Sequence, residues 1–342
     1  MKNIKKLIQS IRDKNFQSKK ICFILGNTKK IENKSFFLTP VRENDDIIFF
    51  GAIVFNDHVA KKILKIIDGN VDYVFVDIEK KIQSKNSNRN LINIERSAKD
   101  YIKKSKLNVY KANDLAISSA ETLINNLFLK DKRGIGGKKI LILGLGNIGF
   151  KLSLKLVESG ADIFAFRRNQ KTLNHFANTI NLIKPLGTLS KINVLKKLPE
   201  NLKKFDIIIT AVDQNNLIKL KHVKNIKTKT VLIDAGKGNF APDAIKYLRK
   251  KGHLIYRLDT TSSYFSYIQN LIYTENQYKN DLKINKINKY TLVTQGIVGS
   301  KNDYIVDHIK YPKKIFGRCD GKGGLKQLNE MTKKKILKII TK

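Results

Sequence analysis

The sequence has little cysteine and no long apolar run. Cys22 and Cys319 are the only cysteines among 342 residues, which excludes a cysteine-based metal cage and suits a reducing cytoplasm. No apolar stretch approaches the roughly 18–20 residues that span a membrane. Residues 1–16 predict an amphipathic basic helix without the continuous apolar core of a secretory signal. We therefore expect a cytoplasmic protein that does not bind a membrane.

Acidic residues are also scarce, because 29 of them accompany 67 basic residues and leave a formal charge of +38. Such a charge raises the question of a nucleic-acid partner. Specific phosphate or base contacts would recruit arginine, yet 57 of the basic residues are lysines and ten are arginines. The lysines are spread through every segment and accompany the isoleucine and asparagine of A/T-rich codons. We predict no specific nucleic-acid partner and only a weak, salt-sensitive affinity for polyanions.

Histidine is rare as well, and the five histidines do not occur at metal-ligand spacings: His58, His175, His222, His253 and His308. The sequence therefore predicts no metal site. Asp57 and His58 stand at an expected helix start, where a capping role is the plainer interpretation.

The most informative stretch is 138–168, in which a short apolar run precedes three glycines at G-x-G-x-x-G spacing. Apolar positions at helical spacing and a second apolar run follow, in the order strand, turn, helix, strand. Gly144 permits a tight turn, Gly146 lets the backbone approach a pyrophosphate, and Gly149 lets the helix pack on the strand. The start of the helix, at Asn147 and Ile148, would offer its N–H groups to the phosphates. The alternative is a purely structural turn.

The end of the second strand predicts which cofactor binds. An acidic residue there would bind the ribose 2′-hydroxyl of NAD, but this sequence has Arg167 and Arg168. Two guanidinium groups suit a 2′-phosphate, so we predict NADP in preference to NAD. The alternative is a solvated basic edge on a very basic protein.

The pattern of elements predicts an α/β protein of two domains, which a chain of this length can form. We expect an N-terminal α/β substrate domain at 1–112 and a connecting helix at 113–130. A Rossmann domain with a doubly wound parallel sheet would occupy 131–300, and a turn and a helix 301–342. A polar segment, Gln83–Asn90, is the expected flexible loop.

Ligands of an open parallel sheet lie beyond the carboxyl ends of its strands. At these ends the sequence places a segment expected beside the nicotinamide ribose, namely Thr210, Ala211 and Val212. It also places there the candidate catalytic residues Lys237, Asp234 and Asp259. Lys237 could bind a substrate carboxylate or polarise a carbonyl or imine. The alternatives are a solvated lysine and, for Asp234, a turn or cap residue.

Two further groups of polar residues could face a substrate cleft. Asp77, Glu79 and Lys80 follow an expected strand, but a solvated turn is the plainer interpretation. On the connecting helix, Ser118, Ser119 and Glu121 could line the cleft, and we favour ordinary positions on its exposed face.

Parts of the sequence resemble two groups of dehydrogenases. Gly144–Gly149, Val231–Asp259 and Leu292–Gly299 resemble segments of D-2-hydroxyacid dehydrogenases. That family has an arginine where this sequence has Lys237 and a catalytic histidine where it has Gly296, and Thr260–Ser263 supply no counterpart of its glutamate. The family's acid/base pair is therefore absent.

The helix at 113–127 before the glycine turn is similar to the layout of shikimate dehydrogenases, amino-acid dehydrogenases and the A subunit of dipicolinate synthase. These place the substrate domain first. The resemblances imply an NAD(P)-dependent oxidoreductase acting on a small, carboxylated keto, imino or hydroxy compound. Alternatives are a dipicolinate-synthase-like or shikimate-dehydrogenase-like enzyme, or a nucleotide-sensing protein without catalysis. A homodimer is common in such folds, although no interface is identified.

Overall fold

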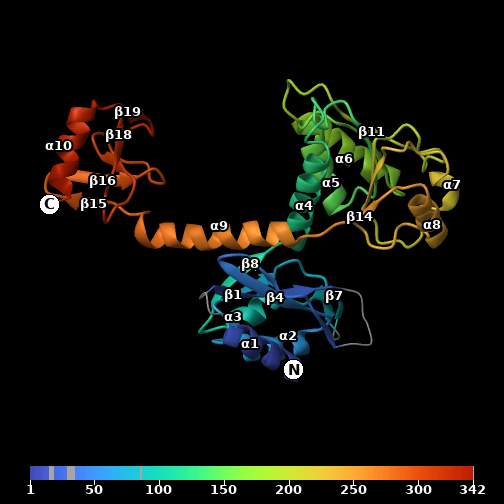
Figure 1. Ribbon diagram of the computed structural model, residues 1–342, viewed down its shortest axis with the longest axis horizontal. Helices are drawn as coiled ribbons and strands as arrows, with labels where there is room; N and C mark the ends of the chain where they lie inside the picture. Colours follow the sequence, from blue (N-terminus) through green and yellow to red (C-terminus); the bar gives the residue numbers. More distant parts are fainter. Residues whose placement is uncertain (15–18, 29–34, 85–86, 342) are drawn as a thin grey trace. The chain divides into compact units, whose positions relative to one another are not determined.

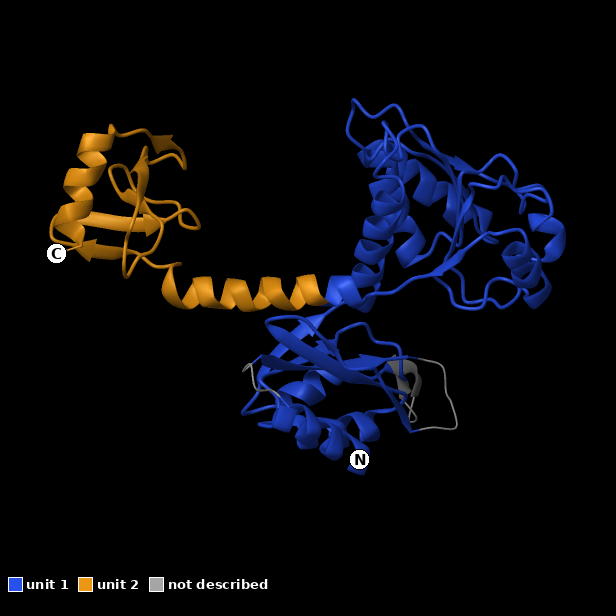
Figure 2. Cartoon of the chain, in the orientation of Figure 1, with its two compact units in different colours: residues 1–264 blue, residues 265–342 orange. Residues whose placement is uncertain are grey.

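A computed structural model of the protein describes residues 1–14, 19–28, 35–84 and 87–341 (Figure 1). The chain divides into two compact units, Met1–Tyr264 and Phe265–Lys342 (Figure 2). Unit 1 holds two sheets with parallel strands, and unit 2 holds a third sheet with its own core.

The N-terminal sheet of unit 1 has the strand order β2-β4-β1-β5-β8. Four strands are parallel: β1 (Lys20–Asn27), β4 (Ile47–Val54), β5 (Tyr73–Asp77) and β8 (Lys106–Tyr110). β2 (Phe36–Leu38) and β3 (Arg42–Glu43) pair with β4 in the antiparallel sense. One apolar core joins this sheet to α1 (Lys2–Lys14), α2 (Asp57–Ile67) and α3 (Ile94–Tyr101). The sequence therefore forms the expected α/β layer at its N-terminus.

The segment expected to be a flexible loop, Gln83–Asn90, contains a short antiparallel pair, β6 (Gln83–Ser84) and β7 (Ser87–Leu91). Residues 85–86 of that segment lie outside the described residues. Two short strands thus stand where the composition alone predicted a loop.

The second sheet of unit 1 has six parallel strands in the order β11-β10-β9-β12-β13-β14. These are β9 (Lys139–Leu143), β10 (Asp162–Phe166), β11 (Ile192–Val194), β12 (Ile207–Thr210), β13 (Val231–Asp234) and β14 (Ile255–Arg257). Read from β9 as strand one, the order is 3-2-1-4-5-6, that of the doubly wound dinucleotide-binding fold. Its strands are nearly continuous apolar runs because both faces are covered.

Helices cover both faces of the Rossmann sheet. One core contains residues of α4 (Ala112–Leu127), α5 (Asn147–Glu158) and α6 (Gln170–Ile183). The opposite core contains residues of α7 (Leu220–Val223) and α8 (Pro242–Lys250). The expected connecting helix, α4, is therefore part of the Rossmann core. The sequence analysis did not predict α6 or β11.

The sequence analysis predicted that the Rossmann domain ends at residue 300, but the last strand of its sheet in the structure is β14 (Ile255–Arg257). β16 (Tyr290–Thr294) belongs to the sheet of unit 2, in the order β15-β16-β17-β18-β19. Its companions are β15 (Asn285–Ile287), β17 (Tyr304–Val306), β18 (Ile315–Cys319) and β19 (Leu325–Lys326). The range 301–342 thus holds three strands as well as a turn and α10 (Glu330–Ile340). Periodicity predicts a strand but not the sheet that it joins.

α9 (Thr261–Asn280) is the remaining helix of the described residues. In the part of the chain that the structure describes, every helix is too short or too polar to cross a membrane.

Candidate functional site

The glycine turn between β9 and α5 shows which of its glycines the packing requires. Gly144 has φ of +101°, and a Cβ there would lie 2.6 Å from the carbonyl oxygen of Ala211. A Cβ on Gly149 would lie 2.1 Å from the carbonyl oxygen of Gly144. A Cβ on Gly146 would meet no atom within 4 Å. Two glycines are therefore needed for close packing, and the third borders open space.

The first turn of α5 faces that open space without a capping side chain. Gly146 is the N-cap residue, and it offers no side-chain acceptor to the N–H groups that follow. Asn147 is exposed and Ile148 is half-buried. Unpaired N–H groups and the positive end of the helix dipole favour an anion there. The residues at this turn therefore fit the pyrophosphate of a dinucleotide.

The segment after β12 packs directly against the turn. The N–H of Ala211 donates to the carbonyl oxygen of Leu143, at 2.8 Å, and the Val212 side chain lies beside Gly144. Thr210 is fully buried, and its hydroxyl donates to Asp234 Oδ1 at 3.2 Å. Ala211 and Val212 therefore border the turn, whereas Thr210 acts inside the sheet.

The structure separates the two arginines that follow β10. Arg167 Nη1 donates to the carbonyl oxygen of Leu145 at 2.7 Å, and the guanidinium lies 5.5 Å from the ring centroid of Phe176. Arg168 is exposed, and its side chain forms no hydrogen bond or ion pair with the described residues. Arg167 braces the glycine turn, and Arg168 is available to a ligand.

The segment after β13 is organised around Asp234. Its carboxylate accepts the N–H groups of Lys237 at 2.9 Å, Gly238 at 2.8 Å and Asn239 at 3.2 Å. Lys237 takes a left-handed conformation, with φ of +65°, and its residue is exposed. The carboxylate of Asp234 thus holds the loop that presents Lys237.

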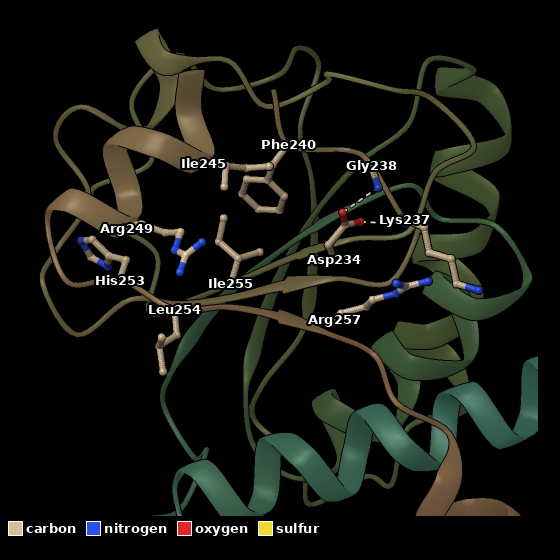
Figure 3. Close-up of a pocket in the computed structure, with 10 residues that line it drawn as sticks. All are labelled: Asp234, Lys237, Gly238, Phe240, Ile245, Arg249, His253, Leu254, Ile255 and Arg257. Atoms are coloured by element: carbon tan, nitrogen blue, oxygen red, sulfur yellow. Dashed lines mark hydrogen bonds between the residues drawn. The ribbon is translucent and has the colours of Figure 1, made fainter. Parts of the chain in front are cut away.

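A cavity of about 530 Å³ lies beside this loop (Figure 3). The residues that line it come from the loop, from α8 and from β14: Asp234, Lys237, Gly238, Phe240, Ile245, Arg249, His253, Leu254, Ile255 and Arg257. The structure therefore brings two of the three candidate catalytic residues, Asp234 and Lys237, to one cavity.

The third candidate, Asp259, does not line that cavity. Its Oδ1 accepts the hydroxyl of Thr261 at 2.6 Å and the N–H of Thr261 at 2.9 Å, at the start of α9. The side-chain hydrogen bond from Thr261 holds the pKa of Asp259 below its usual value, against a smaller effect of burial. Arg42 Nε also donates to Thr261 Oγ1, at 2.6 Å. Asp259 therefore anchors a helix start within unit 1.

The polar residues at the end of β5 differ in exposure: Asp77 is buried, Glu79 is half-buried and Lys80 is exposed. Asp77 is 2% exposed, and its Oδ2 lies 2.8 Å from Lys81 Nζ, which also lies 2.8 Å from Glu79 Oε2. Burial raises the pKa of Asp77 despite the opposing effect of Lys81. Glu79 Oε1 accepts the N–H of Asn113 at 3.2 Å. The expected solvated turn is thus wrong for the two acids, which accept N–H groups at the start of α4, and it holds for the exposed Lys80.

On α4 the expectation of exposed polar positions holds for one of three residues. Ser118 is exposed. Ser119 is 3% exposed, and its Oγ lies 2.6 Å from Ser263 Oγ. Glu121 is half-buried and pairs with Lys155 at 2.8 Å. Ser119 and Glu121 therefore have packing roles.

Sequence analysis missed Arg249 and Arg257, which line the cavity. The available indication was their residue type, because arginine is rare in this lysine-rich chain. Within the described residues, no group of three or more His, Cys, Asp or Glu side chains could hold a metal ion, and the absence of a metal stays a prediction.

Residues 139–238 match the model of a family described as NADP oxidoreductase, coenzyme F420-dependent. This range extends from β9 to the loop after β13, so it includes the glycine turn, both arginines and Lys237. No curated protein matches the sequence significantly.

Solved structures with a similar course of the chain include enzymes of several kinds. The A subunit of dipicolinate synthase from Bacillus halodurans is 13% identical, with 75% of this chain and 97% of that chain covered and a TM-score of 0.37. Its counterpart from Bacillus subtilis is 16% identical, with 78% and 82% covered and a TM-score of 0.38. L-tryptophan dehydrogenase of Nostoc punctiforme is 12% identical, with 80% and 88% covered and a TM-score of 0.44. Likeness at this level assigns neither a substrate nor a residue role.

The match and the geometry concern the same part of the chain. The strand order 3-2-1-4-5-6 and the glycine turn are those of a dinucleotide-binding domain. Over residues 139–238 the protein is accordingly a Rossmann domain similar to that of NADP oxidoreductases.

Proposed function

We propose that the protein is an NADP(H)-dependent oxidoreductase acting on a small carboxylated keto, imino or hydroxy compound. The observation that supports it best is the glycine turn. Gly144 and Gly149 are fixed by packing, whereas Gly146 borders open space at an uncapped helix start. Such a turn lets backbone N–H groups approach a pyrophosphate.

The cofactor would be held by residues around this turn. Asn147 and Ile148 would give their N–H groups to the pyrophosphate, and Arg168, which is exposed, would bind the 2′-phosphate. Ala211 and Val212 would border the nicotinamide ribose. The nicotinamide supplies or accepts the hydride.

Lys237 is the residue that we propose for the substrate. It stands just beyond the carboxyl end of β13, where ligands of this fold bind. Its ammonium would bind the substrate carboxylate or polarise the reacting carbonyl or imine. Asp234 would act by holding the loop, since its oxygens already accept three backbone N–H groups.

A second candidate is a nucleotide-sensing protein without catalysis. It is favoured by the engagement of both candidate acids, because Asp234 holds its loop and Asp259 accepts from Thr261. Gly296, expected where a related family has histidine, follows β16 and lies outside the Rossmann sheet. A third candidate function is that of a reductase or synthase similar to dipicolinate synthase or shikimate dehydrogenase.

Two assays test the proposal: oxidation of NADPH by a panel of small 2-keto and imino acids, and reduction of NADP+ by the corresponding hydroxy acids. We expect at least one acid to oxidise or reduce the cofactor, with Lys237→Ala at least tenfold slower. A protein that binds NADPH but turns over none of the panel would be the sensor. Lys246→Ala, an exposed change on α8, is the control.

We further propose a cytoplasmic protein without a specific nucleic-acid partner, and we leave a homodimer open. Fractionation of cells, mobility shifts with unrelated nucleic acids and ultracentrifugation test these points separately.

A further inference from the structure

The cavity at the edge of the Rossmann sheet is built from one helix and one strand. On α8, Ile245 and Arg249 are four residues apart and share a face. On β14, Ile255 and Arg257 are two residues apart and point to the same side of the sheet. Each element thus contributes an isoleucine and an arginine to the cavity.

The face of α8 that carries Ile245 and Arg249 does not pack into the hydrophobic core. Ala244 and Leu248 supply the buried stripe of the helix, while Ile245 and Arg249 are exposed. β14 is the last strand of its sheet. The cavity therefore lies beside the sheet edge, next to the core rather than inside it.

The positive side chains lie at the two ends of the cavity (Figure 3). Arg249 lies toward His253 at one end, and Arg257 extends toward Lys237 at the other. This follows from topology, because α8 runs opposite to the strands that it connects. An apolar wall lies between the ends and includes Phe240, Ile245 and Ile255.

Little negative charge balances these groups. Among the described residues, Asp234 is the only acid that lines the cavity, and its carboxylate accepts three backbone N–H groups of its own loop. Within the described part of the chain, the guanidinium groups of Arg249 and Arg257 form no hydrogen bond or ion pair. Two uncompensated guanidinium groups favour two anionic groups.

The residue type adds a second argument. The chain uses arginine at ten of 342 positions and lysine at 57, so ten residues taken at random would include fewer than one arginine. Two arginines occur among the ten residues that line this cavity. Arginine differs from lysine in its planar fork, which binds a carboxylate through two parallel hydrogen bonds.

We propose that this cavity binds a dicarboxylate whose two acid groups are joined by an apolar body. Arg249 binds one carboxylate and Arg257 the other, while the apolar wall covers the chain between them. The volume of about 530 Å³ is within the range of small-molecule sites. No residue of the glycine turn lines the cavity, so the site extends beyond the proposed cofactor site, and it shares Asp234 and Lys237 with the proposed substrate loop.

Calorimetric titration of the full chain with α,ω-dicarboxylates from succinate to sebacate tests the proposal. We expect an optimum at intermediate length and at least tenfold tighter binding than for the monocarboxylate of equal length. Arg249→Ala and Arg257→Ala should each weaken binding about tenfold, and the double variant should abolish it. Arg249→Lys should restore part of the affinity, because it keeps the charge but not the fork.

Arg96→Ala is the matched control, since Arg96 is an exposed arginine on α3. All variants should keep the wild-type affinity for NADPH and the wild-type Tm. Absence of dicarboxylate binding at millimolar concentration, or binding that survives in the double variant, would overturn the proposal. Arginine-dependent dicarboxylate binding in a protein that binds no NADPH would remove the oxidoreductase function and leave this site standing.

Discussion

Arg167 Nη1 donates a hydrogen bond to the carbonyl oxygen of Leu145, at 2.7 Å, and so ties the end of β10 to the glycine turn. Its neighbour Arg168 is exposed and without such a contact in the described structure. The two arginines, which the sequence presents as a pair, therefore have different surroundings.

The first prediction separates the two arginines. Arg168→Ala should weaken NADPH binding about tenfold and leave NADH binding unchanged, because it removes a partner of the 2′-phosphate alone. Arg167→Ala should weaken both cofactors to a similar extent and lower the Tm, because it releases the turn. Fluorescence titrations and thermal unfolding measure these effects. A larger NADPH-specific loss in Arg167→Ala would reverse the assignment.

The second prediction uses two glycines of the same turn. Gly149→Ala should destabilise the fold by about 2–3 kcal/mol, since its Cβ would lie 2.1 Å from the Gly144 carbonyl oxygen. Gly146→Ala should cost less than about 1 kcal/mol, because φ is −93° and nothing lies within 4 Å of the new Cβ. Urea unfolding measures both.

The effect of the same two glycines on cofactor binding, measured for the fraction of each variant that folds, should have the opposite order: Gly146→Ala should weaken binding more than Gly149→Ala. Gly146→Ala should weaken NADPH binding at least tenfold, because its Cβ would occupy the open space in which we propose that the pyrophosphate binds. If it bound NADPH as tightly as the wild type, the open space at Gly146 would have no part in cofactor binding.

The third prediction concerns the left-handed backbone of Lys237, with φ of +65°. Both Lys237→Gly and Lys237→Ala remove the amine, but only glycine adopts this conformation without strain. Lys237→Gly should therefore be about 1 kcal/mol more stable than Lys237→Ala. Both should lose turnover to the same extent if the amine acts on the substrate. Unequal rates would show that the loop conformation, and not the amine, limits turnover.

The fourth prediction concerns pH. Burial disfavours the charged form of Asp68, but its Oδ1 accepts the N–H groups of Lys103, Lys104 and Ser105, and these hold its pKa below the usual value. A lowered folded-state pKa stabilises the protein above the unfolded-state value, 3.8, and this contribution is lost as the pH falls through the folded-state pKa.

Asp68→Asn should therefore lower the Tm at neutral pH and show a smaller further drop on acidification than the wild type. Asp13→Asn is the control, because Asp13 is an exposed acid on α1. An identical acid-induced drop in Asp68→Asn and the wild type would contradict the prediction.

The sequence predicted the strand, glycine turn, helix and strand at the centre of the Rossmann domain for a physical reason. The glycine turn, the apolar runs of β9 and β10 and the helix between them are local features, and each is visible within a few residues. α6 escaped because its asparagines, Asn174, Asn178 and Asn181, are poor helix formers. The burial of Leu173, Ala177 and Ile180 outweighs them.

The C-terminal sheet could not be predicted in the same way. β16 has the apolar run of a strand, but its partners, β15 and β17, are chosen by packing. Burial of Asp77 also depends on Lys81, and the sequence does not show that Lys81, rather than Lys80, turns toward it. Asp234 holds its loop by accepting backbone N–H groups. Every residue type except proline supplies such groups, so the sequence pattern does not reveal this role.

Titration of the purified protein with NADPH and NADH, followed by fluorescence, tests the central claim most directly. The account predicts tight NADPH binding and weaker NADH binding, with the preference lost in Arg168→Ala. Binding of neither cofactor by the folded protein would contradict it, because the glycine turn would then be structural and the oxidoreductase function would fall.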